Sequence, residues 1–128
     1  MNSAISEGVS IEVETFYQPE YSNPAKKEYL FAYRITIKNH NNFPVQLISR
    51  YWNIFDSDGT KKEVEGEGVV GNQPVILPSE TYQYISSCLL HTEIGRMKGA
   101  YLMQNLHSKK MLNVTIPTFM LQAPPKLN

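Results

Sequence analysis

The sequence predicts an all-β protein, an immunoglobulin-like or fibronectin type III-like β-sandwich of about seven strands. Apolar and polar residues alternate along most of the 128-residue chain, as they do in strands that bury one face. Turn signals separate these segments every ~8–12 residues, and no helical periodicity continues beyond about two turns. Trp52, the single tryptophan, lies in the third predicted strand, and this favours a sandwich because such folds often bury a tryptophan between their sheets.

The first two predicted strands lie in the N-terminal third of the chain. Alternation over 9–13 predicts the first strand, and two prolines within 18–27 predict an exposed loop. Alternation over 31–38 is the most regular in the chain and predicts the second strand. Residues 39–42 read Asn-His-Asn-Asn, which predicts a turn.

The third predicted strand runs over 45–55, and its returning partner over 61–65. Asp58-Gly59 lies between them and predicts a hairpin with a type I′ turn, which needs positive φ at both central residues. Simple alternation divides the apolar residues of the third strand between two faces, with Val45, Leu47 and Tyr51 on one and Ile48, Trp52 and Ile54 on the other.

The C-terminal half continues the same pattern, and its last residues, 123–128, are expected to fray. The predicted elements, in chain order, are a glycine-rich loop over 66–71, an extended segment over 74–78, a turn at Ser79-Glu80, strands over 82–86 and 97–103, a turn over 105–108, and a last strand over 111–116 that ends at Pro117.

Composition limits the classes of partner. Twelve lysine and arginine residues balance twelve aspartate and glutamate residues, and the basic residues are too scattered to follow a nucleic-acid backbone. Cys88 is the only cysteine, which excludes an internal disulfide and favours a reducing compartment. No apolar run approaches the ~20 residues that span a bilayer. We therefore expect one cytoplasmic domain over residues 1–128, with no nucleic-acid partner and no membrane partner.

The run Gly66-Glu67-Gly68-Val69-Val70-Gly71 has the spacing of a dinucleotide-binding loop. A helix must follow such a loop, whereas residues 72–78 contain two prolines and β-branched residues that prevent one. Two interpretations of the glycines stay open: they permit sharp turns with positive φ, or their backbone N–H groups bind an anion together with Arg50. The candidate ligand-binding residues are Arg50, Gly66, Glu67, Gly68 and Gly71.

The carboxylates beside this loop suggest a metal site. Glu63, Glu65 and Glu67 alternate and so can share one strand face, where they could hold Mg²⁺, or Co²⁺ if a histidine joins them. These three are the candidate metal ligands, and no other cofactor is expected. The alternative is a solvated acidic face, and Arg50 could instead pair with Glu65 or Glu67 across the hairpin.

Cys88 and His91 are the only neighbouring pair that suggests a nucleophile with its base, or two metal ligands. No third ligand, orienting acid or nucleophile-elbow motif accompanies them. We therefore expect a partly buried thiol, a solvated histidine and no catalytic residues.

Six motifs follow one another in a fixed order over nearly the whole chain. They are Tyr17-x-Pro19, Phe31-x-Tyr33-x-Ile35-x-Ile37-x-Asn39, Val45-Gln46-Leu47-x-Ser49-Arg50-x-Trp52, Glu65 to Gly71 with Gln73-Pro74, Met97-x-Gly99-x-Tyr101-x-Met103, and Ile116-Pro117-x-Phe119-x-Leu121. In this order the chain resembles the bacterial ApaG family, whose domain also occurs in some F-box proteins and a polymerase-delta-interacting protein. Tyr51, where histidine is common, and Leu89, where proline often follows the cysteine, depart from the family pattern.

The resemblance implies a fibronectin-like β-sandwich. It also implies an association with cobalt and magnesium resistance, and with genes for diadenosine-tetraphosphate hydrolysis, while the eukaryotic relatives look like protein-interaction modules. We expect a noncatalytic binding module, indirectly linked to cobalt and magnesium resistance, for a protein partner, a homodimer through sheet edges, or a small anionic ligand. The alternative is Mg²⁺- or Co²⁺-dependent binding or weak hydrolysis of a dinucleoside polyphosphate.

Overall fold

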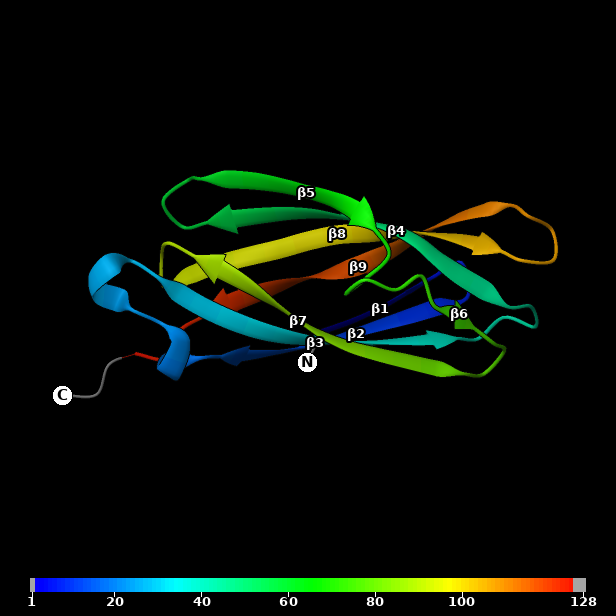
Figure 1. The fold of residues 1–128 in the computed structure, drawn as a ribbon, viewed down its shortest axis with the longest axis horizontal. Coiled ribbons are helices and arrows are strands. Elements are labelled where there is room, and N and C mark those ends of the chain that lie inside the picture. The colour runs from blue at the N-terminus through cyan, green and yellow to red at the C-terminus, as the bar shows by residue number, and fades with distance from the viewer. Residues whose placement is uncertain (1, 126–128) are drawn as a thin grey trace.

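A computed structural model describes residues 2–125 and confirms the all-β sandwich (Figure 1). Two antiparallel sheets face each other, one with strand order β1-β2-β3-β7 and the other with order β5-β4-β8-β9, and β6 pairs with β4. Within the described residues the strands are β1 Asn2–Ser6, β2 Val9–Tyr17, β3 Tyr29–Asn39, β4 Val45–Asp56, β5 Lys61–Glu67, β6 Val75–Ile76, β7 Thr81–Leu90, β8 Ile94–Asn105 and β9 Met111–Gln122, and short 3₁₀ turns cover Pro19–Tyr21 and Pro24–Lys26.

The described residues form nine strands rather than about seven, because two short strands were not predicted. β1 contains only two apolar residues, so its sequence shows little alternation, and it forms by pairing with β2. β6 is only two residues long and lies between Pro74 and Pro78. It forms because it pairs with Val45 and Gln46 of β4. Both strands depend on a partner strand rather than on their own sequence.

The last strand does not end at Pro117, as the proline suggested, but continues to Gln122. The register with β8 shifts between Met97 and Gly99, which pair with Phe119 and Ile116, so Pro117 lies in a β-bulge. A bulge leaves a residue out of the hydrogen-bonded ladder, and proline, which has no N–H to donate, fits there.

A second bulge, at Ile48, corrects the predicted faces of the third strand. The register of β4 with β8 shifts between Leu47 and Ser49, so Ile48 is an extra residue. Alternation reverses at such a residue, and Leu47 and Trp52 therefore both face the core, where 0% and 3% of their surfaces are exposed. The prediction that they lie on opposite faces is wrong.

The hairpin predicted at Asp58-Gly59 joins β4 to β5, but its turn is not type I′. Gly59 has a φ of +93°, whereas Asp58 is not among the residues with positive φ. The loop is closed by Gly59 N donating to Asp56 O over 3.1 Å and by Asp56 N donating to Thr60 O over 2.9 Å. One glycine with positive φ is enough in this longer loop.

Aromatic side chains fill the middle of the sandwich. Tyr33, Trp52 and Phe119 meet in pairs with ring centroids 5.7 to 5.9 Å apart. Tilted and edge-to-face contacts of this kind add to the stabilisation that burial alone supplies. They join β3 of one sheet to β4 and β9 of the other.

Asn39 at the end of β3 is a fully buried polar residue and holds two segments together. Its side-chain amide donates to Phe43 O over 2.8 Å and to Ile76 O over 3.0 Å, and its Oδ1 accepts from Asn41 N over 3.0 Å. We expect Asn39→Ala to lower the free energy of unfolding by about 2–4 kcal/mol, because it leaves buried carbonyls unpaired. Guanidinium denaturation measures the loss.

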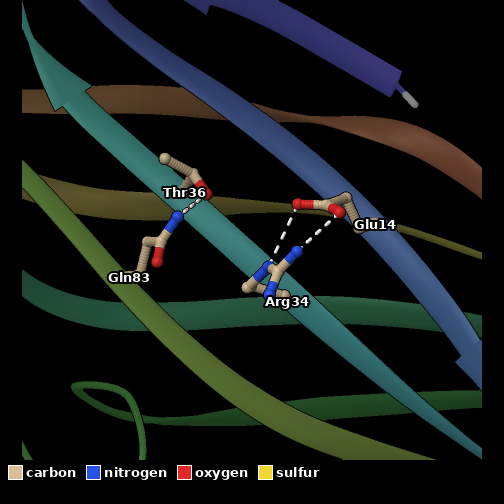
Figure 2. A network of polar contacts seen from close by, with 4 residues as sticks. All are labelled: Glu14, Arg34, Thr36 and Gln83. Carbon is tan, nitrogen blue, oxygen red and sulfur yellow. Dashed lines mark hydrogen bonds and ion pairs between the residues drawn. The ribbon is translucent and has the colours of Figure 1, made fainter.

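Gln83→Ala is the matched control for Asn39→Ala. Figure 2 shows the outer face of the first sheet, where Gln83 Nε2 donates to Thr36 Oγ1 over 2.9 Å in an exposed position. Its loss should change the free energy of unfolding by less than about 0.5 kcal/mol. Equal losses in the two variants would contradict the assigned role of Asn39.

An ion pair borders the same outer face (Figure 2). Arg34 donates from Nε to Glu14 Oε1 over 3.0 Å and from Nη2 to Glu14 Oε2 over 2.7 Å. The hydrogen bond from Arg34 lowers the pKa of the Glu14 carboxyl, and the guanidinium also lies 5.5 Å from the ring centroid of Phe16. The face is therefore polar here, and it becomes apolar toward Ala32, Ile85 and Leu89.

Candidate functional site

The sandwich is closed along one side and open along the other. On the closed side β1 lies against β9, and Thr115 N donates to Ser6 Oγ over 2.9 Å. On the open side the edge strands are β7 and β5, and in Figure 1 the segment after β5 descends toward β7. A pocket of about 590 Å³ opens here, within the range of ordinary ligand sites.

A second hollow of about 220 Å³ extends the pocket along the same side. The two hollows share Tyr33, Arg50, Trp52, Ser86 and Ser87, so they adjoin each other and together make a depression between β7 and β5. We call this depression the seam groove. It runs from the loop at Val69 to Gly71, past these five residues, to Lys62 and Leu89.

Aromatic side chains line the floor of the seam groove. Alternation along β3, β4 and β7 turns Tyr33, Trp52 and Tyr84 toward the space between the sheets. Beneath them the hydroxyl of Tyr84 bonds that of Tyr101. Burial raises the pKa of Tyr33, Tyr84 and Tyr101, so these tyrosines stay neutral at physiological pH. The floor therefore offers apolar rings and hydroxyl groups, not negative charge.

Arg50 supplies positive charge to the seam groove. It pairs with Gly66 across β4 and β5, and its guanidinium lies over that glycine, where an added Cβ would be 2.8 Å from Nη1. Nη1 donates to Glu67 O over 3.0 Å and to Gly68 O over 2.9 Å. The interpretation that Arg50 pairs with a glutamate carboxylate is wrong, because the ion pairs within 4.0 Å in residues 2–125 are Arg34–Glu14 and Lys61–Glu63.

The glycine-rich loop makes a tight turn at the mouth of the groove. Val69 N donates to Asn72 O over 2.8 Å, and Asn72 N donates to Val69 O over 2.9 Å. The two central residues, Val70 and Gly71, have φ values of +47° and +78°, so the type I′ geometry expected at Asp58-Gly59 occurs here. A β-branched residue is strained at positive φ, and strain of this kind concentrates at functional sites.

Gly68 has a structural role in anchoring this loop. Its φ is +59°, and an added Cβ would collide with Asn72 O. Gly68 N donates over 2.8 Å to the carbonyl of the bulge residue Ile48, which also accepts from Gln73 Nε2 over 2.9 Å. The N–H groups of Gly68, Val69 and Asn72 thus donate within the protein, and the charged donors that line the groove are Arg50 and Lys62.

The three candidate metal ligands do not line the seam groove. Val64 pairs with Trp52 and packs against the core, so Glu63, Glu65 and Glu67 project from the opposite, exposed face of β5. In the part of the chain that the structure describes, no three His, Cys, Asp or Glu side chains gather in a way that could hold a metal ion. A cation site on this face stays a prediction.

Cys88 lines the inner end of the groove, but His91 is not its base. Only 7% of Cys88 is exposed, and burial raises the pKa of its thiol to about 11. His91 lies in the turn after β7, where its Nδ1 is 3.3 Å from Lys27 O. The hydrogen bond of the His91 ring thus goes to Lys27 O rather than to the Cys88 thiol.

The raised pKa of Cys88 predicts that its thiol reacts slowly. Since the thiolate reacts and forms only as pH rises toward about 11, we expect Cys88 at pH 8 to react with a disulfide reagent about 100-fold more slowly in the folded protein than in the unfolded chain. The two reaction rates are measured at pH 8, with and without denaturant, from the change in absorbance as the disulfide reagent reacts. A fast folded-state reaction with a midpoint below pH 9 would contradict it.

Comparison with known proteins identifies the family. The family model for the ApaG domain matches residues 19–105. The chain belongs to the ApaG family. It is 44% identical over 124 residues to Protein ApaG of Brucella canis, covering 97% of this chain and 95% of that protein. A crystal structure described as that of an ApaA protein from Bordetella pertussis is 40% identical with a TM-score of 0.87, covering 92% of this chain and 95% of that one.

A more distant structure shares the fold alone. A protein from Archaeoglobus fulgidus has a TM-score of 0.53 at 8% identity, covering 90% of this chain and 98% of that one. No helix in the described part of this ApaG-family chain is long and apolar enough to cross a membrane.

The groove of this ApaG domain contains residues that sequence reasoning did not single out. Val70, Ile85 and Ser86 line it, whereas of the candidates Arg50, Gly66, Glu67, Gly68 and Gly71 only Arg50 and Gly71 are among its described lining residues. For Ile85 and Ser86 a signal existed in the sequence, because β7 carries no charged residue over its whole length. The absence of charge in β7 indicates a binding surface only because β7 is an edge strand, and the sequence did not show that it is one.

Proposed function

We propose that this ApaG domain is a noncatalytic binding module whose ligand site is the seam groove, and that Arg50 binds an anionic group of the ligand. The observation that carries the proposal is the position of Arg50, on the inner face of β4 beside an aromatic floor. Rings that pack against an apolar body, with one charged donor to orient it, are typical of ligand sites.

The charge of the groove supports an anionic ligand. Arg50 and Lys62 line it, while no aspartate or glutamate is among its described lining residues. Glu63, Glu65 and Glu67 project from the opposite face of the sheet, so they do not oppose an anion here. A low-dielectric depression lined by one sign of charge concentrates ligands of the other sign.

The chemistry of the lining supports binding rather than catalysis. Burial raises the pKa of Tyr84 and that of Cys88, so neither offers an anion as base or nucleophile near neutral pH. Under this proposal any link to cobalt or magnesium resistance is indirect, since the described lining of the groove carries the cationic side chains of Arg50 and Lys62 and no carboxylate.

A titration with a small aromatic anion tests the proposal. We expect 4-hydroxyphenylacetate to shift the NMR signals of the Trp52 indole, the Arg50 side chain and the Val70 amide in a saturable way. The matched neutral amide should shift them at least about tenfold more weakly, because it lacks the charge-assisted hydrogen bond. Equal responses to acid and amide, or shifts confined to other surfaces, would contradict the proposal.

The metal-dependent alternative is tested by a separate titration. Diadenosine tetraphosphate is added with and without Mg²⁺ or Co²⁺, to the native protein and to Glu67→Gln. Binding that requires the metal and is lost in the variant would favour a nucleotide site on the acidic face of β5 over the seam groove.

A further inference from the structure

We propose that the partner at this groove is an extended acidic segment of another protein, which adds as a strand to the free edge of β7. The inference rests on the proposed function, because the acidic side chains of the segment would bind Arg50. It assigns the class of ligand and the strand that receives it.

The β7 edge lacks the protection that the other sheet edges have. Edge strands usually carry charges, proline or a bulge, or are covered, because their free N–H and C=O groups pair with any available strand. In β5 five of seven residues are charged, and β9 contains the Pro117 bulge and lies against β1. The ten residues of β7 include no charge, no proline and no glycine. Such an edge is suited to accepting a strand.

The two faces of β7 present different surfaces to an added strand. Ile85 and Leu89 project outward and are 60% and 44% exposed. Tyr84 and Ser86 project inward into the seam groove, and Ile85 and Leu89 border it where it reaches the outer side of the β7 edge. Because side chains alternate along a strand, the bound segment should place apolar residues beside Ile85 and Leu89 and a different set above the groove.

The charged residues beyond β7 indicate which residues of the bound segment should face the seam groove. Arg50 and Lys62 lie on the inner side of the opposite sheet, toward β5, and both line the seam groove. A strand added to β7 would extend the first sheet over them. Covering cations is costly unless carboxylates pair with them, so the inward residues of the segment should be acidic.

The charges of Arg50 and Lys62 also disfavour a second copy of this chain at the edge. Pairing of β7 with its symmetry mate would bring inward only the uncharged residues of a second β7. Arg50 and Lys62 would then be covered without a counter-charge, at a cost in desolvation. An acidic partner segment removes that cost, and a dimer remains as an outcome of the test.

The experiment uses a capped peptide of alternating Val and Glu, roughly eight residues long, which is the length of an ordinary strand. We expect it to shift the β7 amides and the Arg50 side chain in NMR titrations of the whole protein. The matched Val and Gln peptide should bind about tenfold more weakly. Two further acidic peptides carry backbone N-methyl groups, one on the odd residues and one on the even residues.

The N-methyl peptides separate strand addition from side-chain recognition. Alternate residues of a strand direct their N–H groups to opposite edges, so one peptide should lose binding and the other should stay within about threefold of the parent. Equal binding by both would overturn strand addition while leaving the anion site at Arg50 intact. If the methylated peptides differ but the Gln peptide binds as well as the acidic one, the acidic assignment and the proposed function both fail.

Sedimentation of the free protein completes the test. We expect a monomer, or a dimer that the acidic peptide dissociates. A dimer whose β7 amides respond to none of the peptides would assign this edge to a second copy and overturn the proposal. A monomer with no response at β7 would overturn it as well.

Discussion

Gly99→Ala is expected to lower the free energy of unfolding by about 3 kcal/mol or more. Gly99 lies in β8, between Trp52 of β4 and Ile116 of β9. An added Cβ would collide with Tyr51 O and lie 3.0 Å from Cε3 of Trp52. The carbonyl is part of a central sheet ladder and cannot move without breaking the pairing of β4 with β8.

Gly66→Ala is the control for this prediction. Its Cβ would meet only the end of the Arg50 side chain, at 2.8 to 2.9 Å, and a flexible side chain can move aside. We expect a loss of about 1 kcal/mol or less, because the guanidinium can shift while it keeps its hydrogen bonds to Glu67 O and Gly68 O. Denaturation followed by circular dichroism compares the two variants. An equal loss for both would show that the contact with Tyr51 O is not what requires a glycine at 99.

Arg50→Met has the second large expected effect. Methionine keeps an unbranched apolar side chain but removes the hydrogen bonds to Glu67 O and Gly68 O. We expect the free energy of unfolding to fall by about 2 kcal/mol, since these bonds have a charged donor. Amide exchange in 68–72 should accelerate, because Arg50 fastens this loop to β4. The affinity for 4-hydroxyphenylacetate should fall at least about tenfold.

Arg50→Lys separates the two roles of the arginine. A lysine restores the charge but not the planar fork that reaches two carbonyls and an anion together. Arg50→Lys should recover part of the anion affinity that Arg50→Met loses. The amides of residues 68–72 should still exchange faster than in the native protein. If Arg50→Met leaves anion affinity unchanged and alters only loop exchange, Arg50 is a purely structural residue and the proposed site fails.

The candidate site was predictable in part. Arg50 and the glycines stand out in the sequence because a charged residue and a run of glycines within strand-like segments are unusual. That Glu67 offers its carbonyl rather than its carboxylate to Arg50 was not predictable, because it depends on the register of β4 with β5. Glu63 and Glu65 were correctly expected to alternate, but which face they occupy depends on where Trp52 lies.

The sequence by itself determined the β-sandwich class, most of the strands, the β4–β5 hairpin and the exclusion of a Rossmann loop. These follow from local physics: alternation with a period of two residues, turn residues with positive φ, and prolines that prevent a helix. The tertiary structure alone decided the bulges at Ile48 and Pro117, the inner face that Leu47 shares with Trp52, and the exposed edge at β7. A bulge and an edge are relations between strands far apart in the chain, so the pairing of the strands had to be known before either could be located.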